Sequence, residues 1–80
     1  MQKLEKFNLS IITRIDGLRQ AKGLSWTELA YASGISKGGM SEIKNGLVEA
    51  KFSTLCKISI GLNIAPCELL NFNIDLSELD

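Results

Sequence analysis

Residues 24–46, LSWTELAYASGISKGGMSEIKNG, carry the clearest structural signals in the chain. Ser25 and Glu28 form a capping box, in which the Ser25 hydroxyl accepts from the Glu28 amide and the Glu28 side chain accepts from the Ser25 amide. The helix that begins there is predicted to end at Gly34, because glycine adopts the left-handed conformation without a clash at Cβ. The stretch therefore opens with a short helix whose two ends are well defined.

A second short helix is predicted after a turn of three or four residues. Ser36 is a residue type that caps helix N-termini, Met40 and Ile43 have the spacing of an inward face, and Asn45-Gly46 ends the run. Two short helices joined by a turn that contains glycine form a helix-turn-helix unit. Such a unit presents the outer face of its second helix to a groove.

The flanking sequence predicts three more helices. The first carries Ile11, Ile15 and Leu18 on one face and is expected to start before Ser10. Ser53 is expected to cap the fourth helix, and proline fits the first position of the fifth. The inward residues of these two helices are predicted to be Leu55, Ile58, Leu62, Leu69 and Leu70. Only residues 72–76 have the pattern of a short extended segment, so the fold class is all-α.

Composition bounds the possible functions. Eighty residues with 45% hydrophobic content make one domain with a buried core. The absence of histidine excludes Ser-His and Cys-His nucleophile pairs and the common zinc sites, so we expect no catalytic, metal or cofactor site. No apolar run or signal segment indicates a membrane or secreted protein. We interpret Cys56 and Cys67 as small buried hydrophobes of a cytoplasmic protein.

The charge is unevenly distributed along a chain whose net charge is zero. Residues 68–80 contain four acidic residues and no basic one, which leaves nine basic and five acidic residues, a net charge of +4, in residues 1–67. Such an asymmetry is typical of a nucleic-acid-binding face with an acidic tail, and equally of an ordinary solvated surface. We expect a domain at residues 10–70, between an N-terminal extension at 1–9 that could be helical and an acidic tail at 71–80.

The chain resembles the phage-repressor and Cro-like helix-turn-helix proteins, also called the XRE family. The resemblance covers residues 11–70 and rests on the order and spacing of Ile15, Leu18-Arg19, Lys22-Gly23-Leu24-Ser25, Glu28-Leu29-Ala30, Gly34-Ile35-Ser36, Ser41, Ile43, Asn45-Gly46, Ser53-Thr54-Leu55, Ile58, Leu62-Asn63-Ile64 and Glu68-Leu69-Leu70. It implies a compact five-helix bundle of the lambda-repressor-like type. It also implies a repressor-like regulator of transcription that is commonly dimeric and inserts helix 36–45 into the major groove of double-stranded DNA.

The resemblance further implies which residues meet the bases. Lys37, Gly38 and Ser41 correspond to base-facing positions, with Glu42 beside them. Lys37 is also readable as a solvated surface lysine. Gly38-Gly39 stands where relatives often carry base-reading side chains, and two glycines cost a helix about 2 kcal/mol relative to alanine.

The other candidate residues correspond to positions that face the phosphate backbone. Ser36 and Asn45 match positions that usually bind phosphate, and Trp26 stands where relatives often carry a phosphate-binding glutamine. Ser25 joins this set, although both serines are helix caps first and Trp26 is also readable as a packing residue. Two lysines are readable as phosphate contacts or as surface charge, namely Lys44 and Lys51.

Two more departures from the family pattern concern charge. Lys44 occupies a position where relatives often carry an acid that pairs with the residue at the Arg19 position. We therefore expect that pair to be absent or rerouted, with Glu42 as the candidate partner. The loop at residues 47–52 lacks its frequent proline and carries Glu49, whose charge is unfavourable near phosphate.

Two functions remain open at this point. One is a homodimeric, sequence-specific DNA-binding regulator, with Phe72, Ile74 and Leu76 as candidates for the contact between subunits. The other is a helix-turn-helix module for protein-protein interaction, such as an antitoxin or an antirepressor-type partner, with weak DNA binding of its own. The acidic, leucine-containing tail at residues 71–80 favours a protein partner.

Overall fold

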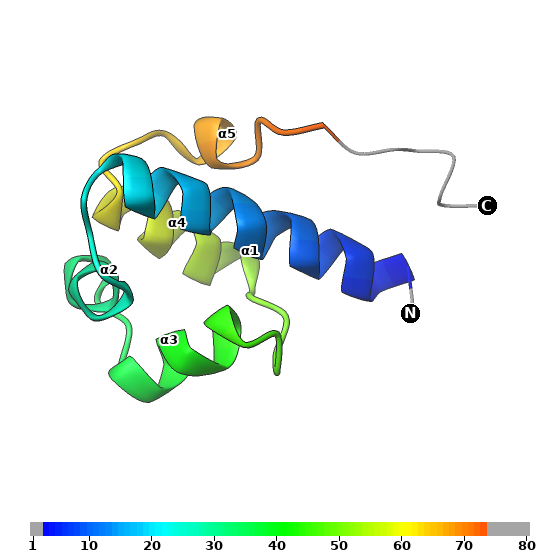
Figure 1. The fold of residues 1–80 in the computed structure, drawn as a ribbon, viewed down its shortest axis with the longest axis horizontal. Coiled ribbons are helices and arrows are strands. Elements are labelled where there is room, and N and C mark those ends of the chain that lie inside the picture. The colour runs from blue at the N-terminus through cyan, green and yellow to red at the C-terminus, as the bar shows by residue number, and fades with distance from the viewer. Residues whose placement is uncertain (1–2, 74–80) are drawn as a thin grey trace.

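The computed structural model of the protein describes residues 3–73. All regular secondary structure in this range is helical, and the elements are α1 (Lys3–Ala21), α2 (Trp26–Ser33), α3 (Lys37–Lys44), α4 (Phe52–Gly61) and α5 (Pro66–Leu69). α3 and α5 lie at opposite sides of the bundle, with α1 and α4 between them (Figure 1). The predicted all-α fold with five helices is confirmed. α1 is continuous through Ser10, so residues 3–9 belong to it.

The predicted caps of α2 and α3 are present. Ser25 N donates to Glu28 Oε1 at 2.9 Å, and Glu28 N donates to Ser25 Oγ at 3.0 Å, which completes the capping box. Gly34 ends α2 with φ of 69°, in the left-handed region that glycine enters without strain. Ser36 Oγ accepts from the backbone of α3 in the same way. The turn between the two helices is therefore closed by residues that the sequence specifies locally.

The core lies between all five helices. Ile15, Leu29, Ile58, Leu62 and Leu69 are completely buried. α2 packs most extensively against α4, and α1 and α4 are both joined to the short α5. The remaining buried apolar residues are Ile11, Ala30, Met40 and Ile43, so α3 reaches the core through the two residues that were predicted to face inward.

One glycine allows α4 to approach the end of α2. An ideal Cβ built on Gly61 would collide with Ser33 Oγ and would lie 3.0 Å from Ser33 N and 3.2 Å from the carbonyl carbon of Ala32. The Ser33 hydroxyl is buried and has no hydrogen-bond partner among the residues that the structure describes. A residue with no side chain is therefore required at position 61 for this helix crossing.

Four predictions about the second half of the chain are wrong. Ser53 does not cap α4, because the helix begins one residue earlier, at Phe52, with Lys51 in the N-cap position and no side-chain cap. Cys56 is only partly buried, and Leu55, which packs against the core as predicted, is also only partly buried. Leu70 is 46% exposed, since it follows the last residue of α5, and Cys67 is exposed on that single helical turn.

The chain beyond α5 returns along α1. Phe72 is partly buried and packs against the core, whereas Asn73 is exposed. The rest of the predicted extended segment, including Ile74 and Leu76, and most of the acidic tail lie outside the described residues. In the range 3–73 no helix has both the length and the hydropathy needed to cross a membrane.

Candidate nucleic-acid interface

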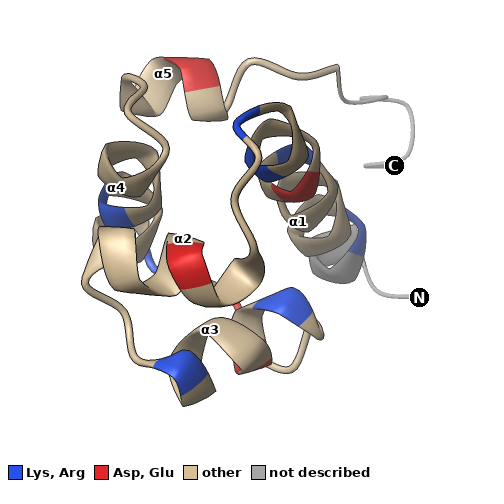
Figure 2. Ribbon diagram, turned by 60° about the vertical axis from the view of Figure 1, so that its left-hand side comes forward, with Lys and Arg blue, Asp and Glu red and all other residues tan. Residues whose placement is uncertain are grey.

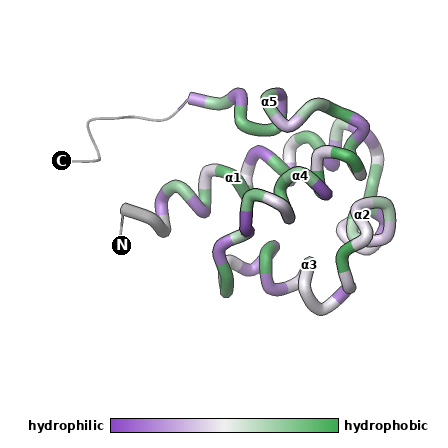
Figure 3. Tube along the Cα trace, turned by 180° about the vertical axis from the view of Figure 1, so that it is seen from behind, coloured by the Kyte–Doolittle hydropathy of each residue, from purple (hydrophilic) through white to green (hydrophobic). Residues whose placement is uncertain are grey.

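The helix-turn-helix unit consists of α2, a turn at residues 34–36, and α3. Met40 and Ile43 anchor the inner face of α3, and Ile35 packs against the core from the turn. The outer residues of this helix are exposed along its whole length: Lys37, Gly38, Ser41, Glu42 and Lys44. Basic segments mark both ends of α3 in Figure 2, and hydrophilic and apolar segments alternate along it in Figure 3. A polar helix face is thus held outward by two buried side chains.

The two glycines of α3 occupy different environments. A Cβ on Gly38 would meet no atom within 4 Å, so this position is open surface. A Cβ on Gly39 would lie 3.0 Å from Ser36 Oγ and 3.5 Å from Ile35 Cγ2. Gly39 N also donates to that same Ser36 oxygen at 3.0 Å. Gly39 therefore makes room for the cap of α3, whereas no intramolecular packing accounts for Gly38.

Polar side chains near the end of α3 contact one another. Asn45 Nδ2 donates to Ser41 Oγ at 3.3 Å, one helical turn away, and both residues are exposed. Asn45 is the C-cap residue of α3 and Gly46 follows it with φ of 71°, so the predicted helix end is confirmed. This bond fixes the direction of the Asn45 amide relative to a residue that was predicted to face the bases.

A charged cluster connects α1 to the start of α2. Asp16 Oδ1 accepts from Arg19 Nε at 3.1 Å and from Arg19 Nη2 at 2.5 Å, and Arg19 Nη1 donates to the Leu24 carbonyl at 2.7 Å. The hydrogen bond from Arg19, together with one from Gln20, holds the pKa of Asp16 below its usual value. The pair is rerouted, as expected, but the partner of Arg19 is Asp16, three residues away on the same helix, and not the candidate Glu42.

Trp26 lies where this cluster meets α3. It is partly buried and packs against the core, as the alternative interpretation of this residue expected. The Cζ atom of Arg19 lies 5.0 Å from the centre of the indole ring, and Lys44 Nζ lies 6.0 Å from it. Residues from α1, α2 and α3 therefore share one aromatic ring at the edge of the helix-turn-helix unit.

Seven of the ten candidate residues line two hollows, one on either side of α3. The first, about 140 Å³, lies between α2 and α3 and brings together four of them: Trp26, Lys37, Ser41 and Lys44. The second, about 430 Å³, lies between α3 and the start of α4 and contains Ser36, Glu42 and Lys51. Ser25, Gly38 and Asn45 line neither of these two hollows.

Thr54 and Lys57 also line the second hollow, and sequence reasoning missed both. Lys51, Thr54 and Lys57 follow one another at intervals of three residues, which is the spacing of one helix face. This spacing is the sequence signal that places Thr54 and Lys57 on the same face as Lys51. Glu49 lines the same hollow, so two carboxylates and two lysines surround it.

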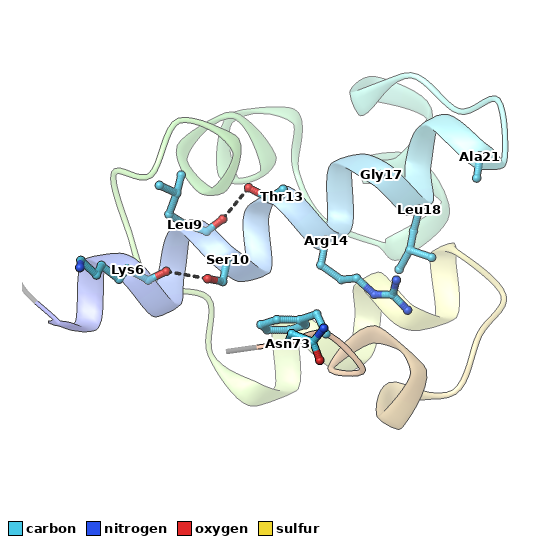
Figure 4. Close-up of a pocket in the computed structure, with 10 residues that line it drawn as sticks. Lys6, Leu9, Ser10, Thr13, Arg14, Gly17, Leu18, Ala21 and Asn73 are labelled. Carbon is cyan, nitrogen blue, oxygen red and sulfur yellow. Dashed lines mark hydrogen bonds between the residues drawn. The ribbon is translucent and has the colours of Figure 1, made fainter. Parts of the chain in front are cut away.

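A larger groove of about 820 Å³ lies on the side of α1 that faces residues 72–73. In Figure 4 the hydroxyls of Ser10 and Thr13 donate to the Lys6 and Leu9 carbonyls, at 3.0 and 2.9 Å, along the helix that forms its wall. Arg14 Nη2 donates to the Glu68 carbonyl at 2.8 Å, which ties α1 to α5. The groove contains none of the ten candidate DNA-binding residues.

Comparisons with known proteins agree with this geometry. Residues 17–69 match the model of the helix-turn-helix family HTH_3. The chain is also similar to the HTH-type transcriptional regulator SutR of Escherichia coli (strain K12), with 36% identity over 64 residues. These residues are 80% of this chain and only 34% of that regulator, so the chain spans about a third of its length. No solved structure matches the chain. The matched range contains the whole of α2, α3, α4 and α5, and the chain therefore belongs to the XRE-type helix-turn-helix family.

Proposed function

We propose that this protein is a sequence-specific, repressor-like regulator of transcription that inserts residues 36–45 into the major groove of double-stranded DNA. The observation that carries the proposal is the outer face of α3, which is polar and exposed while Met40 and Ile43 hold the helix to the core. Membership of the helix-turn-helix family and similarity to a named transcriptional regulator support it. The protein then acts by binding and not by catalysis.

Direct reading of the bases falls to the first turns of α3. Lys37 donates to guanine O6 and N7 or to a phosphate, and Ser41 touches a base edge, with Glu42 beside it. The open space above Gly38 favours close approach of the helix backbone to the groove wall. With few long side chains on this face, part of the specificity then comes from the shape of the DNA.

The phosphate contacts lie around that helix. Ser36 and Asn45 bind the backbone at its two ends, and the two hollows beside it supply further donors. These are Trp26 and Lys44 on the α2 side, and Lys51 with Lys57 on the α4 side. Ser25, which caps α2 and lies outside both hollows, supplies a further donor. Contacts of this kind fix the register of the protein on the duplex without carrying sequence information directly.

We further propose that the protein acts in the cytoplasm as a homodimer. One recognition helix reads only a few base pairs, so useful specificity requires two half-sites about one helical turn apart. Phe72 packs against the core of its own subunit. The candidate contact between subunits is therefore moved toward residues 74–80. Truncation after Asn73 is expected to move the protein toward monomer in sedimentation. An unchanged oligomeric state after truncation would remove the tail from the subunit contact.

The experiment that tests DNA binding compares a duplex selected from a random library with a scrambled duplex, at two salt concentrations. We expect tighter binding to the selected duplex and weaker binding to both as salt rises, since counterions are released from neutralised phosphates. The alternative is a protein-protein interaction module, favoured by the two carboxylates at the second hollow and by the acidic tail. Absence of any salt-dependent binding at low salt would favour that module.

A further inference from the structure

The indole ring of Trp26 is approached by two cationic side chains from two other helices. Arg19 Cζ lies 5.0 Å from the ring centre and Lys44 Nζ lies 6.0 Å from it, both within the range of cation–π attraction. Trp26 is the first residue of α2, while Arg19 lies in the last turn of α1 and Lys44 ends α3. The ring therefore sits at the junction of three helices.

The two cations differ in how their charges are compensated. Arg19 is held by the Asp16 carboxylate and the Leu24 carbonyl, and its side chain is only 17% exposed. Lys44 is exposed and has no ion-pair partner among residues 6–73. Lys44 interacts electrostatically with Asp16 without forming an ion pair, and Asp16, Arg19 and Lys44 together carry a charge of +1. The cluster thus presents one ammonium group to solvent.

We infer that Trp26 is a positioning residue for Lys44, whose ammonium group it holds at the hollow between α2 and α3 for contact with a DNA phosphate. Lys44 and Trp26 both line that hollow, together with Lys37 and Ser41. This inference rests on the proposed function. It adds that the Trp26 side chain sets the position from which Lys44 contacts the phosphate.

The physical basis is the flexibility of lysine. Its ammonium group sits on a four-carbon stem that loses rotamer freedom when it binds an anion. A ring that already restricts the stem in the free protein reduces that loss, so phosphate contact becomes more favourable. Asp16 contributes a second restraint, because its carboxylate interacts electrostatically with Lys44 across the same cluster.

Packing of Trp26 against the core is the competing explanation for its importance. A packing role predicts that removal of the ring weakens every DNA contact through loss of stability. A positioning role predicts a specific coupling between positions 26 and 44. The two explanations are separated by a double-mutant cycle, in which non-additivity reports an interaction between the two altered side chains.

The cycle consists of wild type, Trp26→Leu, Lys44→Ala and the double variant, titrated with a selected duplex at several salt concentrations. We expect Lys44→Ala to weaken binding and to lower the salt slope by about one unit. Trp26→Leu should weaken binding about two- to fivefold, and Lys44→Ala should then add little. Trp26→Phe keeps an aromatic face and should retain most of the affinity, which also provides a test if the leucine variant fails to fold.

Lys51→Ala is the matched control, because Lys51 lines the hollow on the other side of α3. Its effect on affinity should be the same in the wild-type and Trp26→Leu backgrounds. Equal effects of Lys44→Ala in the two backgrounds would overturn the inference while leaving DNA binding intact. Failure of the wild type to bind any duplex at low salt would instead overturn the proposed function, and the inference with it.

A second measurement needs no DNA. Trp26 is the only tryptophan in the chain, so its fluorescence reports on this ring alone. A nearby ammonium group concentrates iodide, and Lys44→Ala should therefore reduce quenching by iodide while quenching by neutral acrylamide stays nearly constant. Lys51→Ala should leave both values unchanged. Iodide quenching that does not respond to Lys44→Ala would show that the ammonium group is not held at the ring.

Discussion

Gly61 faces the buried hydroxyl of Ser33 so closely that no Cβ fits between them. We expect Gly61→Ala to lower the free energy of unfolding by about 1–3 kcal/mol, since overpacking outweighs the better helix propensity of alanine. Gly17→Ala is the control, because its Cβ would meet nothing within 4 Å. That variant should be stabilised by about 0.5–1 kcal/mol. Urea titration measures the free energy of unfolding of both variants. Equal changes in this free energy would contradict the close approach of α4 to α2 at Gly61.

Ile58 and Leu55 lie on the same helix and differ in burial. Ile58 is completely buried, whereas Leu55 is only partly buried at the edge of the core. Ile58→Ala should therefore cost about 2–5 kcal/mol, enough to unfold much of so small a domain, and Leu55→Ala should cost distinctly less. Thermal melting followed by circular dichroism measures both. A larger loss of stability for Leu55→Ala than for Ile58→Ala would show that a different face of α4 packs in the core.

Acid should destabilise the fold through two carboxylates. Hydrogen bonds from Arg19 and Gln20 lower the pKa of Asp16, and hydrogen bonds from the Ser25 backbone and hydroxyl lower the pKa of Glu28. A folded-state pKa below the unfolded value contributes stability that is present above the unfolded pKa, about 4, and lost as pH falls through the folded pKa. Stability measured from pH 6 to pH 2 should therefore decline below about pH 4. The decline should be shallower in Asp16→Asn and Glu28→Gln, and parallel curves for all three proteins would argue against these contributions.

Gly38 and Gly39 should respond differently to alanine. Gly38→Ala fills open surface and should stabilise the protein by about 1 kcal/mol, whereas Gly39→Ala crowds the Ser36 cap and should gain less or lose stability. If the backbone at Gly38 approaches the groove wall, the added methyl group should also weaken DNA binding. Melting and duplex titration of both variants test this. A Gly38→Ala protein that is more stable and binds DNA with unchanged affinity would show that the backbone at Gly38 does not approach the groove wall.

Local signals in the sequence predicted the parts of the fold that local chemistry determines. The Ser25–Glu28 box, Gly34 and the Ser36 cap involve residues within four positions of each other, so their sequence pattern was sufficient. The start of α4 was misplaced because Ser53 resembles a cap, while the actual N-cap, Lys51, makes no side-chain hydrogen bond. Sequence patterns carry less information where a boundary is set by tertiary packing.

The contacts between helices could not be predicted in the same way. The family pattern predicted that the usual partner of Arg19 is missing, but Glu42 was the candidate replacement, whereas the actual partner is Asp16, three residues away on the same helix. The approach of Gly61 to Ser33 joins residues 28 positions apart, and no local pattern announces it. Thr54 and Lys57 come to the side of α3 only through the packing of α4, which no local sequence pattern specifies.

The most direct test of the central claim is the binding of Lys37→Ala and Asn45→Ala to duplexes selected by the wild type, with single base substitutions and at two salt concentrations. We expect Asn45→Ala to weaken binding nearly equally across sequences, since phosphate contacts carry no direct sequence information. Lys37→Ala should also flatten the preference at one base position, by about 1–3 kcal/mol if it reads guanine, or lower the salt slope by about one unit if it meets phosphate.

Lys6→Ala is the control for loss of a surface charge, because Lys6 lines the groove along α1 and lies outside both hollows beside α3. It should bind within about twofold of the wild type, which corresponds to less than 0.5 kcal/mol. The proposed interface on α3 predicts that affinity falls for Lys37→Ala and Asn45→Ala and is retained for Lys6→Ala. Wild-type affinity and salt dependence in both α3 variants would contradict it, because the outer face of α3 would then not be the surface that binds DNA.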